Sequence, residues 1–112
     1  MRRLALGAAL LLFSAATCAY EWPLGIPGDA KAQYYILEIG GKWPGRTVIT
    51  KRTGASGTHY AKRFYDCLNS TVKYLGTGAT LADMARSKSD PDMAPVAPGS
   101  VADYVGREAC KR

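Results

Sequence analysis

Few residues of this 112-residue chain are of a type that could do chemistry. His59 is the single histidine, and only Ser56 and Asp66 lie near it in sequence as a nucleophile and an acid. The order and context of these three residues match no known setting of a nucleophile, a base and an orienting acid. A lone histidine on a strand is more often a surface or packing residue. We therefore expect no catalytic residue and no enzyme activity.

Metal and phosphate binding have equally little support. A metal site needs three or four ligands, whereas Asp90 and Asp92 offer two carboxylates in a loop that contains proline. The run 54–57 (GASG) resembles a phosphate-binding loop, but no predicted helix follows it to gather backbone amides. A hairpin turn is the better interpretation of that run. We predict neither a metal nor a cofactor.

The first 19 residues have the three-part layout of a secretory signal peptide. Arg2 and Arg3 precede an uncharged apolar run over residues 4–13, and small residues follow as far as Ala19. The run is shorter than the roughly 20 residues that a transmembrane helix needs. We predict cleavage after Ala19. Lipidation of Cys18, which would attach the protein to a membrane, is the alternative.

Two further cysteines, Cys67 and Cys110, would remain after export. An oxidising compartment favours a disulfide between them, and two free thiols are the alternative. A small domain would gain stability from such a bond.

Positive charge gathers in the middle of the chain. Lys and Arg number 15 and Asp and Glu number 9, so the net charge is +6, or +4 once Arg2 and Arg3 are removed with a signal peptide. Basic residues dominate between Lys42 and Lys73, and acidic residues become frequent only from Asp83 onward. The sequence therefore predicts a basic surface in the middle of the domain.

We expect this surface to bind a protein or a polyanionic partner. Aromatic residues between the basic ones would also suit single-stranded nucleic acid, but export argues against nucleic acid as a partner. A solvated basic face without a ligand is the alternative. The predicted contacts are Lys51, Arg52, Lys62 and Arg63, with Trp43 as an exposed anchor in a loop.

Four predicted strands carry these residues, over 33–39, 46–52, 58–67 and 71–75. They are rich in β-branched and aromatic residues and are separated by short turns, which is typical of an antiparallel meander. Residues 20–32 are rich in Pro and Gly and are expected to be an irregular lead-in.

Helical signals follow the strands. Thr80 suits the N-cap of a short helical turn over 80–87, and Ser100 suits the N-cap of a helix that ends at Cys110. Three prolines make residues 89–99 an extended connection. An apolar stripe runs along the last helix at Val101, Tyr104, Val105 and Ala109.

The predicted fold class is α+β: an antiparallel β-sheet meander with a C-terminal helix packed on one face and one disulfide. The chain is expected to divide into a signal peptide (1–19), the lead-in (20–32) and a single domain (33–112).

Part of this pattern resembles a known family. The segment 64–67 (FYDC) ends one strand, the next strand carries Lys73 and Tyr74, and 95–100 (PVAPGS) leads into a helix that ends in 108–110 (EAC). This frame, over about residues 58–110, resembles the surface-adhesin protein E family. The resemblance implies the same sheet and helix, a Cys67–Cys110 disulfide and an envelope location in a Gram-negative bacterium. It also implies binding to host extracellular-matrix proteins and a dimer as a possible state.

The sequence thus favours an exported binding protein of the periplasm or the outer-membrane surface. A periplasmic enzyme inhibitor or immunity protein is the alternative. Ser56, Gly57 and Tyr60 resemble the Ser-Gly-x-x-Tyr motif of periplasmic lysozyme inhibitors.

Overall fold

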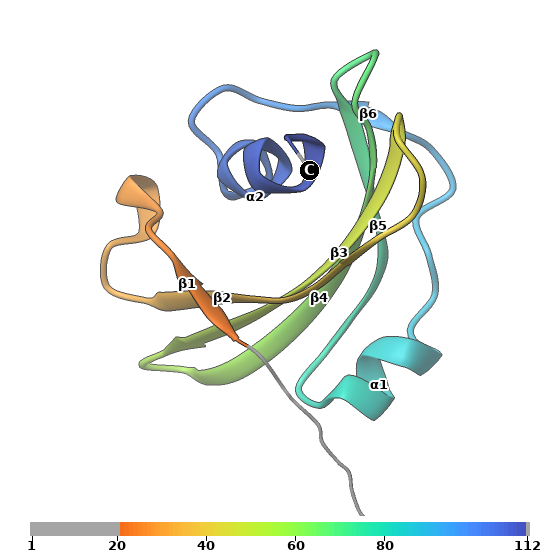
Figure 1. The fold of residues 1–112 in the computed structure, drawn as a ribbon. Coiled ribbons are helices and arrows are strands. Elements are labelled where there is room, and N and C mark those ends of the chain that lie inside the picture. Colours follow the sequence, from red (N-terminus) through yellow and green to blue (C-terminus); the bar gives the residue numbers. More distant parts are fainter. Residues whose placement is uncertain (1–20, 112) are drawn as a thin grey trace, which may run out of the picture.

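The computed structural model describes residues 21–111, so the expected signal segment 1–19 and Cys18 lie outside the described residues. Within that range, six strands form one antiparallel sheet in which neighbours in sequence are also neighbours in space (Figure 1). The strands are β1 (Trp22–Leu24), β2 (Gln33–Gly40), β3 (Gly45–Gly54), β4 (Gly57–Asp66), β5 (Thr71–Gly78) and β6 (Ala94–Pro95). The helices are the 3-10 helix η2 (Pro27–Asp29) and the α-helices α1 (Leu81–Arg86) and α2 (Val101–Cys110).

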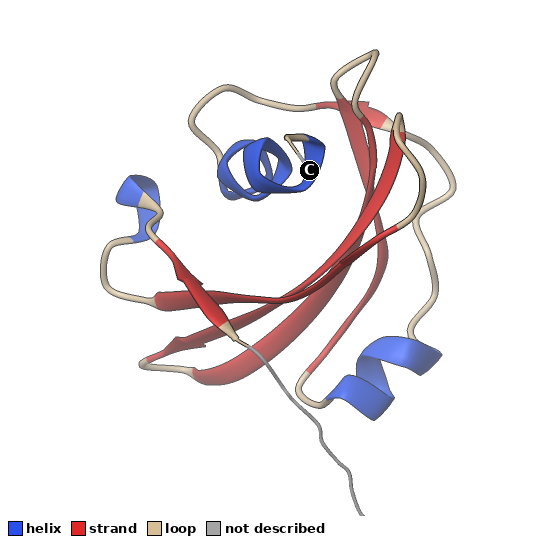
Figure 2. Cartoon of the chain, in the orientation of Figure 1, coloured by secondary structure: helices blue, strands red, loops and turns tan. Residues whose placement is uncertain are grey.

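The sheet is strongly curved, and α2 lies inside the curve against the concave face (Figure 1). The shorter helix α1 lies on the outer, convex side, beside β5 and β4 (Figure 2). This arrangement confirms the predicted α+β meander with a C-terminal helix on one face. The two faces of the sheet therefore have different surroundings.

Two bulges interrupt the ladders. Leu37 is the extra residue of β2 in its pairing with β3, and Leu75 is the extra residue of β5 in its pairing with β4. Bulges increase the local twist of a sheet and bend it. In contrast, β3 and β4 pair without a break along their whole length, and the predicted hairpin turn at 54–57 joins them.

The segment expected to be an irregular lead-in contains β1 and η2, so that prediction was wrong in part. Trp22 and Leu24 flank Pro23 and pair with β2 at the edge of the sheet. An edge strand tolerates proline because it has a neighbouring strand on one side only, so an N–H that points to the open side is not needed for a hydrogen bond within the sheet. Three residues around a proline give too short a pattern to be recognised as a strand.

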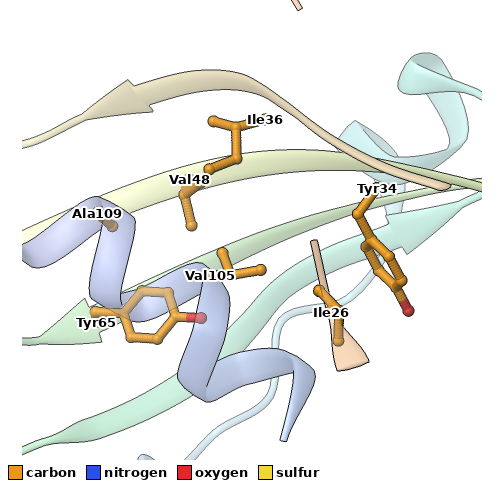
Figure 3. Close-up of a cluster of buried hydrophobic side chains, with 7 residues drawn as sticks. All are labelled: Ile26, Tyr34, Ile36, Val48, Tyr65, Val105 and Ala109. Carbon is orange, nitrogen blue, oxygen red and sulfur yellow. The ribbon is translucent and has the colours of Figure 1, made fainter. Parts of the chain in front are cut away.

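The core lies between the concave face and α2 (Figure 3). Ile36, Val48 and Tyr65 come from β2, β3 and β4, and they meet Val105 and Ala109 of α2. All five side chains are at most 2% exposed. The predicted apolar stripe of the last helix thus forms one wall of the core.

A glycine lets α2 approach the sheet closely. A Cβ at Gly106 would lie 2.6 Å from Cε1 of Tyr65, so a larger residue would push the helix away. The Tyr65 hydroxyl donates a hydrogen bond of 2.7 Å to the carbonyl oxygen of Ala102. Burial raises the pKa of Tyr65 far above its ordinary value. The neutral phenol is therefore a fixed link between β4 and α2.

Two glycines of β5 do the same for α1. A Cβ at Gly76 would overlap the carbonyl oxygen of Met84, and a Cβ at Gly78 would lie 2.5 Å from the Met84 nitrogen. Met84 is buried where α1 meets the sheet. Both glycines belong to β5, which continues to Gly78, beyond its predicted end at residue 75.

Both predicted N-caps are confirmed. Thr80 Oγ1 accepts a hydrogen bond of 3.0 Å from the backbone N–H of Asp83, and Ser100 Oγ accepts one of 3.1 Å from that of Asp103. Between the two helices the described chain contains bends and turns and no helix, and β6 adds a two-residue edge to the sheet.

The predicted disulfide between Cys67 and Cys110 is present. It joins the residue after β4 to the last residue of α2, with 5.7 Å between the two Cα atoms. Disulfides persist in oxidising compartments, so the bond indicates a non-cytoplasmic setting. Over residues 21–111, no helix is both long enough and apolar enough to span a membrane.

Candidate functional site

The pleat of the sheet separates the four basic residues that were expected to share one surface. Val48 lies opposite Arg63 and is buried beneath α2, so Arg63 faces the concave side. Arg52 lies four residues after Val48 on β3 and faces the same side. Lys51 and Lys62 alternate with these arginines and point to the convex side. The expectation of one basic face was therefore wrong.

The convex side carries three lysines among aromatic rings. Lys51 lies opposite both Tyr35 and Tyr60, and Lys73 lies opposite Phe64. We call this surface the convex patch, and we define it by Tyr35, Lys51, Tyr60, Lys62, Phe64 and Lys73.

The lysines of the convex patch differ in their partners. Lys51 Nζ lies 2.9 Å from a carboxylate oxygen of Glu21 and 5.2 Å from the centre of the Tyr35 ring. The hydrogen bond to Glu21 raises the pKa of Lys51. Lys62 and Lys73 form no ion pair with any residue in the range 21–111. Their charges are available to a partner.

The predicted anchor Trp43 lies on the loop between β2 and β3, at one end of the sheet. Its exposed fraction is 52%, and Leu68 on the neighbouring β4–β5 loop is 66% exposed. A backbone hydrogen bond of 2.8 Å from the Cys67 N–H to the Pro44 carbonyl joins the two loops. Two large apolar side chains are thus exposed at the end of the sheet where β4 stops.

The two arginines line a pocket of about 370 Å³ on the concave side, near the start of α2. Arg63 is 5% exposed. Its Nη1 donates 2.9 Å to Thr50 Oγ1, its Nη2 donates 3.3 Å to the Tyr74 hydroxyl, and its guanidinium lies 5.0 Å from the centre of the Tyr74 ring. The pocket walls include Tyr34, Thr50, Arg52, His59, Arg63 and Tyr74.

Arg52 has a carboxylate partner in the same region. Its Nε donates a hydrogen bond of 2.9 Å to Asp29, and the Tyr34 hydroxyl donates one of 2.8 Å to the same carboxylate. The Arg52 guanidinium holds the pKa of Asp29 below its ordinary range. The charge of Arg52 is therefore balanced within the fold.

The residues weighed as a catalytic triad are not brought together. His59 lies near the start of β4 and Asp66 at its end, about 23 Å away for a strand that rises about 3.3 Å per residue. The Asp66 carboxylate accepts hydrogen bonds from the backbone N–H groups of Leu68 and Asn69. Ser56 lies in the exposed hairpin turn at the His59 end.

Asp90 and Asp92, the two loop acids considered as ligands of a cation, lie between α1 and β6. The Asp90 carboxylate accepts a hydrogen bond of 3.4 Å from the backbone N–H of Tyr74, and Asp92 is exposed. Within the described segment, no three His, Cys, Asp or Glu side chains are grouped so that they could hold a metal ion.

Sequence reasoning missed that Arg63 is buried, although a signal was present. Cys67 must face α2 in order to bond Cys110, and every second residue of a strand shares a face. Counting back from Cys67 places Tyr65, Arg63 and Ala61 on the helix side. The same count places Phe64 and Lys62 on the convex side.

Comparison with known proteins gives no relative from which a function could be transferred. No family model, no curated protein and no solved structure matches this chain. The resemblance to the surface-adhesin protein E family stays a prediction. The candidate binding sites are therefore the convex patch and the pocket on the concave side.

Proposed function

We propose that this protein is an exported, non-enzymatic binding protein of the cell envelope that holds a polyanionic partner on its convex patch. The observation that carries the proposal is the position of Lys62 and Lys73 around Phe64, on the face of the sheet opposite α2. Neither ammonium group has an ion-pair partner within residues 21–111.

The physical chemistry of the convex patch favours an acidic polymer. Ammonium groups held on neighbouring strands repel each other, and a chain of negative charges relieves that repulsion. The rings of Tyr60 and Phe64 offer apolar surface between the charges. Ion pairs at such an exposed surface are screened by salt, so affinity is expected to fall as ionic strength rises.

Other features of the chain support the proposed envelope location and a protein as the partner. The disulfide indicates a non-cytoplasmic setting, and the resemblance to surface-adhesin protein E favours the periplasm or the outer-membrane surface. Lipidation of Cys18 would add membrane attachment. Trp43 and Leu68 are exposed apolar anchors that an acidic protein partner could cover while its charges meet the convex patch.

The test uses heparin as a sulfated polyanion and uncharged dextran as its counterpart. We expect heparin to bind the wild-type protein and dextran not to bind. Reversing two charges in Lys62→Glu/Lys73→Glu is expected to weaken heparin binding at least about tenfold, which corresponds to about 1.4 kcal/mol. Surface plasmon resonance at low and high salt measures both affinities.

The matched control is Lys31→Glu/Lys111→Glu. Both lysines are exposed and lie outside the convex patch, and the change in net charge is the same. This control is expected to bind heparin with nearly wild-type affinity. An equal loss in both double variants would mean that only net charge matters, and the assignment to the convex patch would be wrong.

The second candidate is a periplasmic enzyme inhibitor that acts through the β3–β4 hairpin. Residues 55–57 form the exposed tip of that hairpin, so Ser56 is accessible to an enzyme cleft. If this candidate is correct, the wild type inhibits lysozyme and Ser56→Ala does not. Absence of inhibition by the wild type would end this alternative.

A further inference from the structure

The positive charge of Arg63 has no counter-ion in the described part of the chain. The ion pairs found there all involve other basic residues. The side chain is nevertheless 95% buried, and its Nε has no hydrogen-bond partner. Charged side chains are almost never buried to this degree unless they are paired. Packing alone therefore does not account for an arginine at this position.

The groups that hydrogen-bond to Arg63 are neutral hydroxyls, so neither of them balances its charge. Thr50 and Tyr74 accept hydrogen bonds from the guanidinium, so each hydroxyl still has its own proton to donate. No acidic residue lines the pocket in the described part of the chain, and the Asp29 carboxylate is engaged by Arg52 and Tyr34, two residues of the pocket wall. The pocket thus combines one positive charge that has no counter-ion in the described residues with two hydroxyl groups that are able to donate hydrogen bonds.

We propose that this pocket binds the oxyanion of a small organic molecule, a carboxylate or a phosphate monoester, on the guanidinium of Arg63. A guanidinium presents its N–H groups in a planar fork that matches such oxyanions. The rings of Tyr34 and Tyr74 line the same pocket and offer apolar surface to the organic part of the ligand. A volume of about 370 Å³ suits a small molecule.

The Arg63 side of this pocket faces away from the polyanion-binding convex patch, and Tyr60 is the one patch residue that also lines the pocket. Arg63 and Lys62 are consecutive on β4, but they point to opposite faces of the sheet. A polymer on the convex side cannot reach the guanidinium of Arg63 through the sheet. The two sites can therefore be removed separately by variants of adjacent residues.

The informative variant is Arg63→Met, which replaces the unbranched stem of the side chain by a similar apolar one and removes the charged guanidinium. An unpaired buried charge destabilises the empty protein, and an apolar replacement of similar volume is often neutral or stabilising. If Arg63 is retained for a ligand, Arg63→Met has a thermal midpoint equal to or above that of the wild type in chloride buffer. If Arg63 only supports the fold, the midpoint falls.

Binding is measured with benzoate, phenyl phosphate and inorganic phosphate against chloride at equal ionic strength. We expect at least one of the two organic anions to bind one per chain by calorimetry and to raise the wild-type midpoint. The carboxylate and phosphate arms show which oxyanion is preferred. Affinity is expected to fall at least tenfold in Arg63→Met and to stay at the wild-type level in Lys62→Met.

If Arg63→Met does not fold, the same binding measurements are made on Arg63→Lys. It keeps the charge and loses the planar fork, so we expect weaker but measurable binding with an unchanged fold. The proposal is overturned if neither organic anion shifts the wild type beyond chloride. It is also overturned if Arg63→Met or Arg63→Lys binds as tightly as the wild type.

Discussion

Lys62 and Arg63 are consecutive residues of β4, yet they have opposite surroundings. Lys62 points to the convex side without an ion-pair partner in residues 21–111, whereas Arg63 is buried on the concave side against Thr50 and Tyr74. The difference comes from the alternation of side chains along a strand. A substitution at one of the two positions should therefore affect one binding site and leave the other intact.

Three aspartates with lowered pKa values, Asp29, Asp66 and Asp103, make stability depend on acid pH, and two of them are paired with an arginine. Hydrogen bonds from Arg107 and from the Gly99 N–H lower the pKa of Asp103 below its ordinary value of 3.8, and Arg52 does the same for Asp29. Such carboxylates stabilise the folded chain only while ionised, so their contribution is complete above about pH 4 and is lost as the pH falls through the folded-state pKa.

We expect the urea midpoint of the wild type to fall as the pH drops below about 4. The double variant Asp29→Asn/Asp103→Asn is expected to lose less of its stability over the same pH range, because it has fewer carboxylates to protonate. Urea titrations at successive pH values, followed by circular dichroism, measure the effect. Parallel curves for the two proteins would contradict this account of Asp29 and Asp103.

At the scale of elements, the docking of α1 depends on small residues in β5. Gly76→Ala would place a Cβ against the carbonyl oxygen of Met84, so strand and helix would have to separate. Forcing extra atoms into a packed contact costs about 1–3 kcal/mol of unfolding free energy. We expect that loss in urea denaturation, together with faster hydrogen exchange in α1.

Gly25→Ala is the matched control for this prediction. A Cβ at Gly25 would meet no atom within 4 Å, so the unfolding free energy should change by no more than about 0.5 kcal/mol. Equal losses at the two positions would show that backbone effects, rather than contact with Met84, decide the result.

Much of the element order could be predicted, because local signals were strong. Residues 33–39 and 46–52 combine β-branched and aromatic types between turns, and Thr80 and Ser100 are N-caps as expected. The short edge strands β1 and β6 could not be predicted. Each contains a proline and depends on pairing with a longer strand.

The candidate sites were harder to predict than the strands. Composition identified the basic residues, but it carried no information on which face each one occupies. Arg63 is hydrogen-bonded to Thr50 of β3 and Tyr74 of β5, and it lines the same pocket as Val101 of α2. Such contacts arise only when the sheet curves around the helix.

In the whole molecule, the disulfide joins the residue after β4 to the last residue of α2. Cys67 and Cys110 are 43 residues apart, and a loop of that length restricts the unfolded chain by roughly 4 kcal/mol in the chain-entropy model. We expect Cys67→Ser/Cys110→Ser to lose up to about that amount of unfolding free energy, measured by chemical denaturation. A loss below about 1 kcal/mol would mean that the packing of α2 alone fixes the helix.

The two faces of one curved sheet carry the two binding surfaces that we propose. α2 packs on the concave side, and the pocket that Arg63 and Val101 line lies there beside the start of the helix. On the convex side, α1 lies beside the strands that carry Lys62 and Lys73. Binding of a polymer therefore does not require the core to rearrange.

The most direct test of polyanion binding is a map of the bound surface. In a nuclear magnetic resonance titration of the wild-type protein with a short heparin oligosaccharide, we predict the largest amide shifts at residues 60–64 and around Lys73. Small shifts are predicted at the 54–57 hairpin and in α2. Shifts that centre on the hairpin or on α2, or no saturable shift at low salt, would contradict the proposal that the convex patch is the binding surface.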